Sequence, residues 1–230
     1  MPRAKSRVPP GLFSVLSKVS SRIPVAVVTS KDYRFIRRRT GFAWAWACVA
    51  GLEIILSNEF VYTPSRRPRI ERSLETIQRI LPEGILLERK LAADGWLLGF
   101  SVDWTAGPRI TEARIRDLVE LLQSDGLRVF RYPSQSYLDA YSLQPDKGTA
   151  ILRLAGVFGA ETGVAYIGDS PLDNPAFQRS DISIGVDHGQ PMDQLACEYV
   201  VDASLLRSLL ESLLASDLAF SARKLPLSRR

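Results

Sequence analysis

Two carboxylates stand close together after an apolar run in the C-terminal half of the chain. Val164–Ile167 predicts a buried strand, Gly168 ends it, and Asp169 and Asp173 follow. Ser170–Pro171 between them is typical of the first turn of a helix. Open α/β sheets build their sites where strands end, and Mg²⁺ binds one or two carboxylates there together with water and phosphate. The pattern therefore predicts a Mg²⁺ site at Asp169 and Asp173, and a helix-capping turn without further function is the alternative.

A turn rich in hydroxyl groups follows another apolar run near the start of the chain. Pro24–Val28 predicts a buried parallel strand, which ends at Thr29-Ser30-Lys31-Asp32. Hydroxyl groups and free backbone amides at such a place can donate hydrogen bonds to phosphoryl oxygens. Thr29, Ser30 and Lys31 are therefore candidate substrate contacts. Thr and Ser also commonly cap helices, and the turn taken by itself favours capping without further function.

A third candidate is Lys147, which opens a predicted helix that runs to Leu154. A cation at the start of a helix is unfavourably placed, because the helix dipole is positive there. Lys147 is either an ordinary surface lysine or a cation kept for chemistry, where it would neutralise charge on a bound phosphate.

Composition narrows the class of protein. The chain has 230 residues with 46% hydrophobic and 24% charged residues, which is ordinary for a globular protein. The net charge of +5 lies in short clusters without interleaved aromatic residues, and we expect no nucleic-acid partner. Positive potential suits an anionic substrate. A basic protein associated with nucleic acid is a weaker alternative.

The sequence also excludes several kinds of site and location. A single histidine, His188, excludes a site built from several histidines, and Cys48 and Cys197 are expected to be free thiols. We expect no membrane partner, because no apolar run reaches the roughly 18 residues that a membrane span requires. No apolar segment follows the basic first residues, so we expect a cytoplasmic protein.

The order of predicted elements indicates an inserted domain. Between Tyr62 and Leu143 the pattern reads helix, hairpin, helix, hairpin, which predicts an α+β cap domain over 62–143 within a core domain of 1–61 and 144–230. In the core, Ala47–Ile55 predicts one strand and 216–230 a frayed basic tail. The predicted cap helices and strands are Ile70–Leu81, Ile85–Lys90, Trp96–Trp104, Ile115–Leu122, Leu127–Tyr132 and Ser136–Leu143.

Three of these segments resemble motifs of the haloacid dehalogenase (HAD) superfamily of phosphatases. G-D-S-P-L-D-N-P-A-F, from Gly168, resembles its fourth motif, T-S-K-D at Thr29 its second, and the K-G pair at Lys147 its third. The insertion resembles the class IIB type of cap. The resemblance is closest to mannosyl-3-phosphoglycerate phosphatase and to sucrose- and trehalose-phosphatase-like enzymes, although Leu172 replaces the asparagine of the first family. It implies a HAD-like Rossmannoid core, with a parallel sheet, and an inserted α+β cap.

The resemblance also implies a function. It implies a Mg²⁺-dependent phosphomonoesterase that acts on a small phosphorylated sugar or sugar acid. Thr29 and Lys147 would be catalytic, Thr29, Ser30, Lys31 and Lys147 would bind the substrate, and Asp169 and Asp173 would hold Mg²⁺. A catalytically silent binding protein with the same fold is the alternative.

The first motif of the superfamily, a strand ending in D-x-D that carries the aspartate nucleophile, is absent from the sequence. In this fold that strand lies between the strands Val25–Val28 and Val164–Ile167. Either the strand belongs upstream of Met1, or the two flanking strands pair directly and the chemistry is lost. We favour the first interpretation, because the other motif residues are present.

Overall fold

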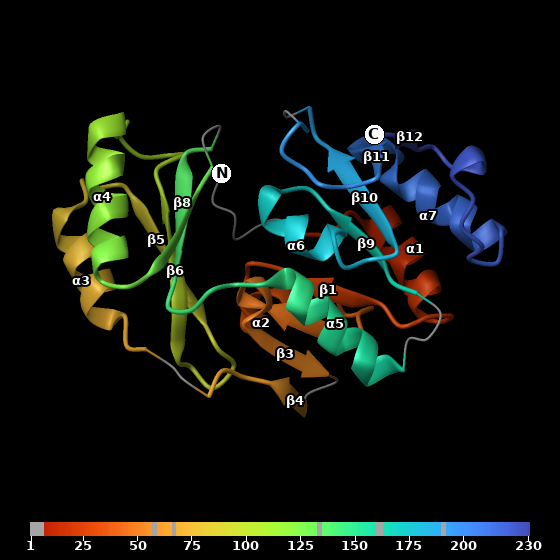
Figure 1. Cartoon of the computed structure of the whole chain (residues 1–230), viewed down its shortest axis with the longest axis horizontal. Helices are drawn as coiled ribbons and strands as arrows, with labels where there is room; N and C mark the ends of the chain where they lie inside the picture. The colour runs from red at the N-terminus through yellow and green to blue at the C-terminus, as the bar shows by residue number, and fades with distance from the viewer. Residues whose placement is uncertain (1–6, 57–58, 66–67, 133–134, 160–162, 190–191) are drawn as a thin grey trace.

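The computed structural model describes residues 7–56, 59–65, 68–132, 135–159, 163–189 and 192–230. It consists of a core and a smaller unit, here called the cap, which lies beside the core (Figure 1). The cap comprises α3 (Glu71–Ile80), β5 (Leu86–Leu91), β6 (Leu97–Asp103), α4 (Glu112–Ser124), β7 (Arg128–Arg131) and β8 (Tyr137–Tyr141). The helix and hairpin order predicted for this segment is therefore confirmed.

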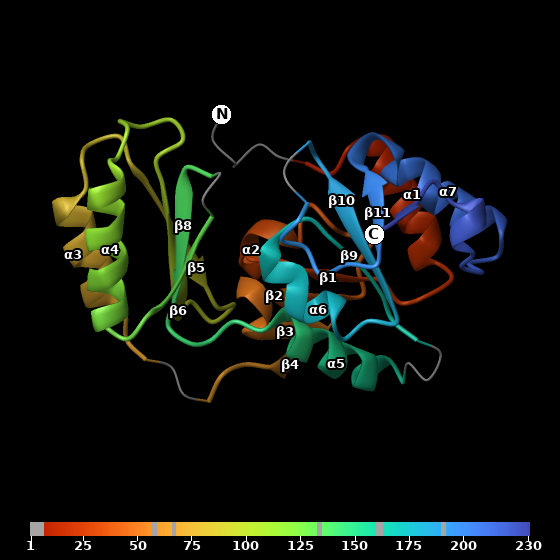
Figure 2. The ribbon, with the colours of Figure 1, turned by 45° about the horizontal axis from the view of Figure 1, so that its top comes forward.

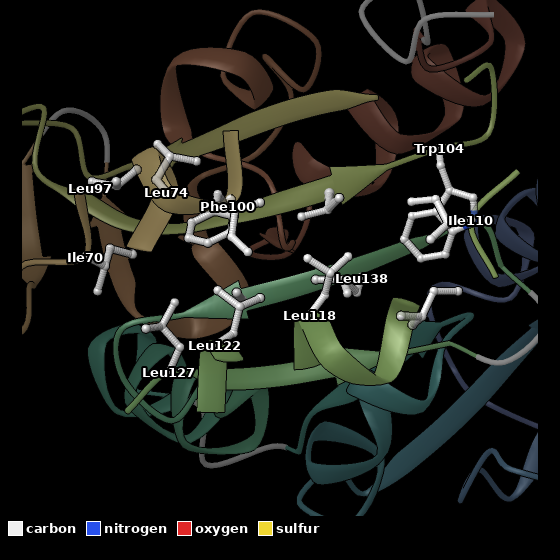
Figure 3. Close-up of a cluster of buried hydrophobic side chains, with 14 residues drawn as sticks. Ile70, Leu74, Leu97, Phe100, Trp104, Ile110, Leu118, Leu122, Leu127 and Leu138 are labelled. Atoms are coloured by element: carbon white, nitrogen blue, oxygen red, sulfur yellow. The ribbon is translucent and has the colours of Figure 1, made fainter. Parts of the chain in front are cut away.

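The cap is an antiparallel sheet covered by helices on one face only. Its strand order is β5-β6-β8-β7, and α3 and α4 lie on the side away from the core (Figures 1 and 2). Alternation along the strands directs Phe100, Val102 and Leu138 toward these helices, where they meet Leu118 and Leu122 (Figure 3). This apolar cluster is the hydrophobic core of the cap.

The opposite side of the cap, which faces the core, carries polar side chains beside the apolar Leu98 and Tyr141, which cluster with core residues. Lys90, Ser101 and Asp139 lie on it and are almost completely buried. Charged residues are rarely buried unless they are paired. A polar sheet face buried against a second unit therefore points to a role beyond packing.

The core contains the remaining elements. Its helices are α1 (Pro10–Ser20), α2 (Tyr33–Ile36), α5 (Lys147–Phe158), α6 (Asn174–Phe177) and α7 (Leu206–Ala215). Its strands are β1 (Ala26–Val28), β2 (Ala45–Cys48), β3 (Glu53–Leu56), β4 (Glu59–Tyr62), β9 (Ala165–Gly168), β10 (Ile182–Asp187), β11 (Tyr199–Asp202) and β12 (Ser228–Arg229). Among the residues described, no helix has the length and apolar character needed to span a bilayer.

The core strands form two sheets, in the orders β1-β2-β3-β4 and β12-β11-β10-β9. The pairs β1–β2, β9–β10 and β10–β11 are parallel, as predicted for the centre of the core. Helix α5 packs on the first sheet through Ala150 and Leu154, and its Ile151 joins a cluster with Tyr166 of the second. Helix α7 covers the other face of the second sheet. The two sheets are thus joined by helices.

In the part of the chain that is described, β1 pairs with β2 and β9 with β10, and β1 does not pair with β9. The alternative in which these flanking strands pair directly is therefore wrong. The edges of β1 and β9 that are unpaired among the described residues are together called the break. Burial agrees with it, because every residue of β2 is buried, whereas β1 is only half-buried and Ala165 of β9 is exposed. Strands at the centre of a parallel sheet are normally buried on both faces.

Two predictions for the core are corrected. Ala47–Ile55 is not one strand, because the turn Val49–Gly51 reverses the chain and makes β2 and β3 antiparallel. Val49, Ala50 and Gly51 have φ of 49°, 54° and 89°, and valine and alanine rarely adopt such left-handed backbone. The C-terminal segment is not frayed, since Ser228–Arg229 pairs with β11.

Candidate functional site at the core–cap boundary

A cavity of about 240 Å³ lies where β1 and β9 end, beneath the polar face of the cap. Thr29, Ser30, Lys147, Asp169 and Asp173 all line it, although they come from three distant segments of the chain. The remaining lining residues are Val28, Lys90, Tyr132, Tyr137, Asp139, Tyr166, Ile167, Gly168, Ser170 and Leu172. The structure thus brings together all the predicted site residues except Lys31.

The centre of the cavity wall is a buried ion pair. Lys147 Nζ lies 2.6 Å from Asp173 Oδ1, which also accepts a hydrogen bond from the Tyr166 hydroxyl at 2.6 Å. Asp173 Oδ2 accepts from the backbone N–H groups of Asp169 and Ser170 and from the Ser170 hydroxyl. Burial acts to raise the pKa of Asp173, but the Lys147 ammonium and these donors outweigh it and lower the pKa.

Two glycines allow this pair to form. A Cβ atom on Gly168 would lie 2.6 Å from Asp173 Cγ, so only glycine lets the Asp173 carboxylate fold back onto the end of β9. A Cβ atom on Gly148 would lie 2.2 Å from the carbonyl oxygen of Pro175, so only glycine lets the first turn of α5 lie against α6. Asp146 caps α5 by accepting from Thr149 N, which fixes where Lys147 begins the helix.

Asp169 differs from Asp173 in its surroundings. Its side chain is 60% exposed, and Oδ2 lies 3.6 Å from Nε2 of His188. Asp173, in contrast, has both oxygens engaged in hydrogen bonds. Of the two predicted metal ligands, Asp169 is the one whose carboxylate is open to solvent.

The site offers few oxygen ligands for a metal ion such as Mg²⁺. The described residues contain no group of three or more His, Cys, Asp or Glu side chains placed to hold a metal ion. Mg²⁺ does not require such a group, because it keeps several waters and binds through one or two carboxylates and substrate phosphate. The open carboxylate of Asp169 fits that requirement, with Asp173 supporting the loop that carries it.

The predicted phosphate loop, Thr29–Lys31, is held by the strained turn that follows β2. Ala50 N donates to Thr29 O at 2.8 Å, and Val49 N donates to Lys31 O at 3.0 Å. Within the loop, Lys31 N donates to Thr29 Oγ1 at 3.1 Å. The left-handed backbone of Val49 and Ala50 is thus used to fix the loop. The ammonium of Lys31 does not line the cavity but bonds to Glu88 of the cap.

The cap supplies cavity residues that the sequence did not indicate. Lys90 Nζ donates to the carbonyl oxygen of Ser30 at 3.1 Å and lies 3.3 Å from Asp139 Oδ1. Asp139 also accepts hydrogen bonds from Ser101, Tyr132 and Tyr141.

Burial shifts the pKa values in this network. It lowers the pKa of Lys90, which Asp139 partly offsets, and it raises that of Tyr132, so the phenol remains a donor. Charged residues in predicted strands normally indicate a solvated face, so nothing in the sequence distinguished Lys90 and Asp139.

The charges around the cavity balance except for one. Lys90 pairs with Asp139 and Lys147 with Asp173, which leaves the Asp169 carboxylate without a lysine partner among the cavity residues described. A bound phosphate would add negative charge to this site. A divalent cation at Asp169 would neutralise both the Asp169 carboxylate and the phosphate, as metal ions do beside phosphoryl groups.

Comparisons with known proteins give a clear likeness of fold. No family model matches the chain, and no curated protein matches it by sequence. Among solved structures, a trehalose-6-phosphate phosphatase related protein matches with a TM-score of 0.67 at 19% identity, covering 95% of this chain and 92% of that one.

Two further solved structures agree with the first. A sugar phosphatase of HAD subclass IIB matches with a TM-score of 0.65 at 11% identity, over 94% of both chains. A haloacid dehalogenase-like hydrolase from Bacteroides thetaiotaomicron matches with a TM-score of 0.68 at 14% identity, over 91% of this chain and 93% of that one. The chain therefore has the HAD-like fold, cap included, and among the described strands of its core β1 and β9 each lie at the edge of a sheet.

Proposed function

We propose that this chain with the HAD-like fold acts as a Mg²⁺-dependent phosphomonoesterase on a small phosphorylated sugar or sugar acid. The observation that carries the proposal is the buried Lys147–Asp173 pair beside the open carboxylate of Asp169, at the strand ends and beneath a cap. The fold shared with sugar phosphatases supports the reaction class.

Different residues of the core would bind a phosphoryl group in different ways. Thr29 and Ser30 present donors at the end of β1, and Lys147 places a buried positive charge in the same cavity. Charge that develops on phosphoryl oxygens is stabilised best by such fixed, desolvated groups. Asp173 holds the Lys147 ammonium in place through their 2.6 Å contact. Mg²⁺ held at Asp169 would supply further neutralisation of the phosphoryl charge.

The size and lining of the cavity support a small substrate. At about 240 Å³ the cavity lies below the ~300 Å³ at which pockets for drug-sized ligands begin. Tyr132 and Tyr137 form part of the cap wall, with ring centroids 4.8 Å apart. Such a wall combines apolar ring faces with hydroxyl groups, which suits a polyol.

The attacking group is the remaining requirement. Among the described carboxylates that line the cavity, Asp139 and Asp173 are occupied by hydrogen bonds, and Asp169 is assigned to the metal. We propose that the nucleophilic aspartate comes from a strand that pairs with β1 and β9 at the break in the sheet. The half-buried state of β1 and β9 supports this placement.

The experiment is hydrolysis of an aryl phosphate with Mg²⁺ by two proteins. The 230-residue chain is expected to be inactive. A version with an apolar strand ending in Asp-x-Asp, joined through a loop ahead of α1, is expected to be active. Replacing the first added aspartate by asparagine should lower the rate of hydrolysis by several orders of magnitude, because no other group can replace a covalent nucleophile.

Robust Mg²⁺-dependent hydrolysis by the 230-residue chain, lost on Asp169→Asn, would contradict the assignment of the nucleophile. The alternative function is binding of a phosphorylated ligand without chemistry, which the hydrogen-bonded state of Asp139 and Asp173 favours. In that case both proteins would bind phosphate and neither would hydrolyse the ester.

A further inference from the structure

One strand of the cap makes two contacts with the phosphate loop of the core. Glu88 and Lys90 are two positions apart on β5, so both side chains leave the same face of the sheet, toward the core. Both Glu88 carboxylate oxygens accept from Lys31 Nζ, at 2.6 and 2.7 Å. Lys90 Nζ donates to the carbonyl oxygen of Ser30 at 3.1 Å. The cap thus touches Ser30 and Lys31 directly.

The Lys31–Glu88 pair is shielded enough to matter energetically. The side chain of Lys31 is 17% exposed and that of Glu88 37% exposed. A charge pair in such a partly buried position is screened less than one on the open surface. The pair also turns the Lys31 ammonium away from the cavity, whose described lining includes Thr29 and Ser30 but not Lys31.

Lys31 therefore has two possible anionic partners. Its flexible four-carbon stem starts next to Ser30, so its ammonium can also serve a phosphate bound at Thr29 and Ser30. A phosphate that recruits Lys31 must take it from Glu88, and the carboxylate then left beside the phosphate repels it. The Lys90 contact holds β5 over the loop and keeps Glu88 within reach of Lys31.

We propose that Glu88 sets the affinity of the site for phosphate, by competing with the phosphoryl group for Lys31. This rests on the proposed function, because it assumes that phosphate binds at Thr29 and Ser30. The competition weakens binding of inorganic phosphate, the product of a phosphomonoesterase, and links product release to re-formation of a contact between cap and core.

The test is the affinity of the 230-residue chain for inorganic phosphate, measured with Mg²⁺ by titration calorimetry or ³¹P NMR. Glu88→Gln removes the competing charge with little change in shape and is expected to tighten binding roughly five-fold, the free energy of a moderately strong ion pair. The gain should shrink at high salt. Glu120→Gln, an exposed residue of α4, makes the same change in net charge and should leave the affinity unchanged.

Variants of Lys31 distinguish competition between Glu88 and phosphate for Lys31 from simple repulsion between Glu88 and phosphate. In a Lys31→Met background, Glu88→Gln is expected to change phosphate affinity far less than in the native background. An equal gain in both backgrounds, or no gain in the native background, would overturn the inference and leave the proposed function standing. Absence of phosphate binding in every variant would overturn both.

Discussion

The ammonium of Lys147 lies 2.6 Å from Oδ1 of Asp173, and both side chains are buried at the point where core and cap meet. The two residues belong to different elements, the first turn of α5 and the turn after β9. Their pairing therefore fixes the relative position of two segments that carry predicted site residues. It also places the Lys147 ammonium in the cavity lining, where a positive charge favours binding of an anion.

Removal of one partner from this pair should be costly. Asp173→Ala leaves Lys147, Tyr166 and the amides of Asp169 and Ser170 without their acceptor. We expect the free energy of unfolding to fall by about 3–5 kcal/mol, as for other buried pairs that lose one charge. Denaturant unfolding measures the change, and Asp117→Ala on the exposed face of α4 is the control. A loss below about 1 kcal/mol would contradict the description of the pair.

Asp173 should also govern stability in acid. Its pKa in the folded protein lies below the ordinary value of 3.8, so its contribution to stability is fully present above pH 3.8 and is lost as the pH falls through the folded pKa. The difference in the free energy of unfolding between the native protein and Asp173→Asn should therefore be constant near neutral pH. It should narrow below pH 3.8, in urea titrations at stepped pH. If this difference in the free energy of unfolding stayed constant at all pH values, the pKa of Asp173 would not be lowered in the folded protein.

Two glycines of the same helix should respond in opposite directions. Gly148→Ala places a methyl group 2.2 Å from the carbonyl oxygen of Pro175, and backbone must move to accommodate it. We expect a loss of about 1–3 kcal/mol, together with weaker phosphate binding as Lys147 shifts. A Cβ atom on Gly156, also in α5, meets nothing within 4 Å. Gly156→Ala should stabilise the protein by about 0.5–1 kcal/mol, since alanine favours the helix. Thermal unfolding of both variants tests the pair.

Asp169 should be the carboxylate on which Mg²⁺ binding depends. Asp169→Asn removes the open carboxylate and should weaken Mg²⁺ binding in the presence of phosphate by more than the roughly ten-fold that loss of an outer partner costs. Asp193→Asn, an exposed carboxylate outside the cavity lining, is the matched control. Calorimetric titration with MgCl₂ gives both values. Unchanged affinity in Asp169→Asn would remove Asp169 from the site.

The break between β1 and β9 should be visible in hydrogen exchange. Val25 and Thr29, which flank β1, bond toward β2, through Trp44 N to Val25 O and Thr29 N to Ala47 O. Because backbone groups alternate in direction along a strand, the N–H and C=O groups of Val28 point to the side of β1 away from β2. By the same alternation, those of Ile167 point to the side of β9 away from β10. We expect the amides of Val28 and Ile167 to exchange much faster than those of β2 and β10. The added strand described above should slow them. Equal protection of β1 and β2 in the 230-residue chain would show that the break is closed in solution.

Much of the fold could be predicted because it depends on local patterns. Apolar runs followed by glycine or hydroxyl residues located β1 and β9, and the Asp146-Lys147-Gly148 sequence located the start of α5. Thr29 and Asp169 each follow a predicted strand, where α/β sheets build their sites, and both line the cavity.

The remainder depends on contacts between distant segments. Glu88, Lys90 and Asp139 are charged residues within strands, and only the packing of the cap onto the core shows that they face a buried site. The different roles of Asp169 and Asp173 likewise follow from the donors around Asp173, which four-residue spacing cannot reveal. The turn at Val49–Gly51 depends on left-handed backbone in residues that ordinarily avoid it.

The edge positions of β1 and β9 also bear on how the chain behaves at high concentration. Strand edges with unpaired backbone groups are templates for pairing with another molecule, and natural proteins usually protect them with charge, proline or a covering segment. Both β1 and β9 are edge strands in the part of the chain that is described, and their residues Ala26–Val28 and Ala165–Ile167 carry no charge and no proline. Self-association through these edges would withdraw the very strand ends that line the cavity, so colloidal stability and ligand binding in this protein depend on the same few residues.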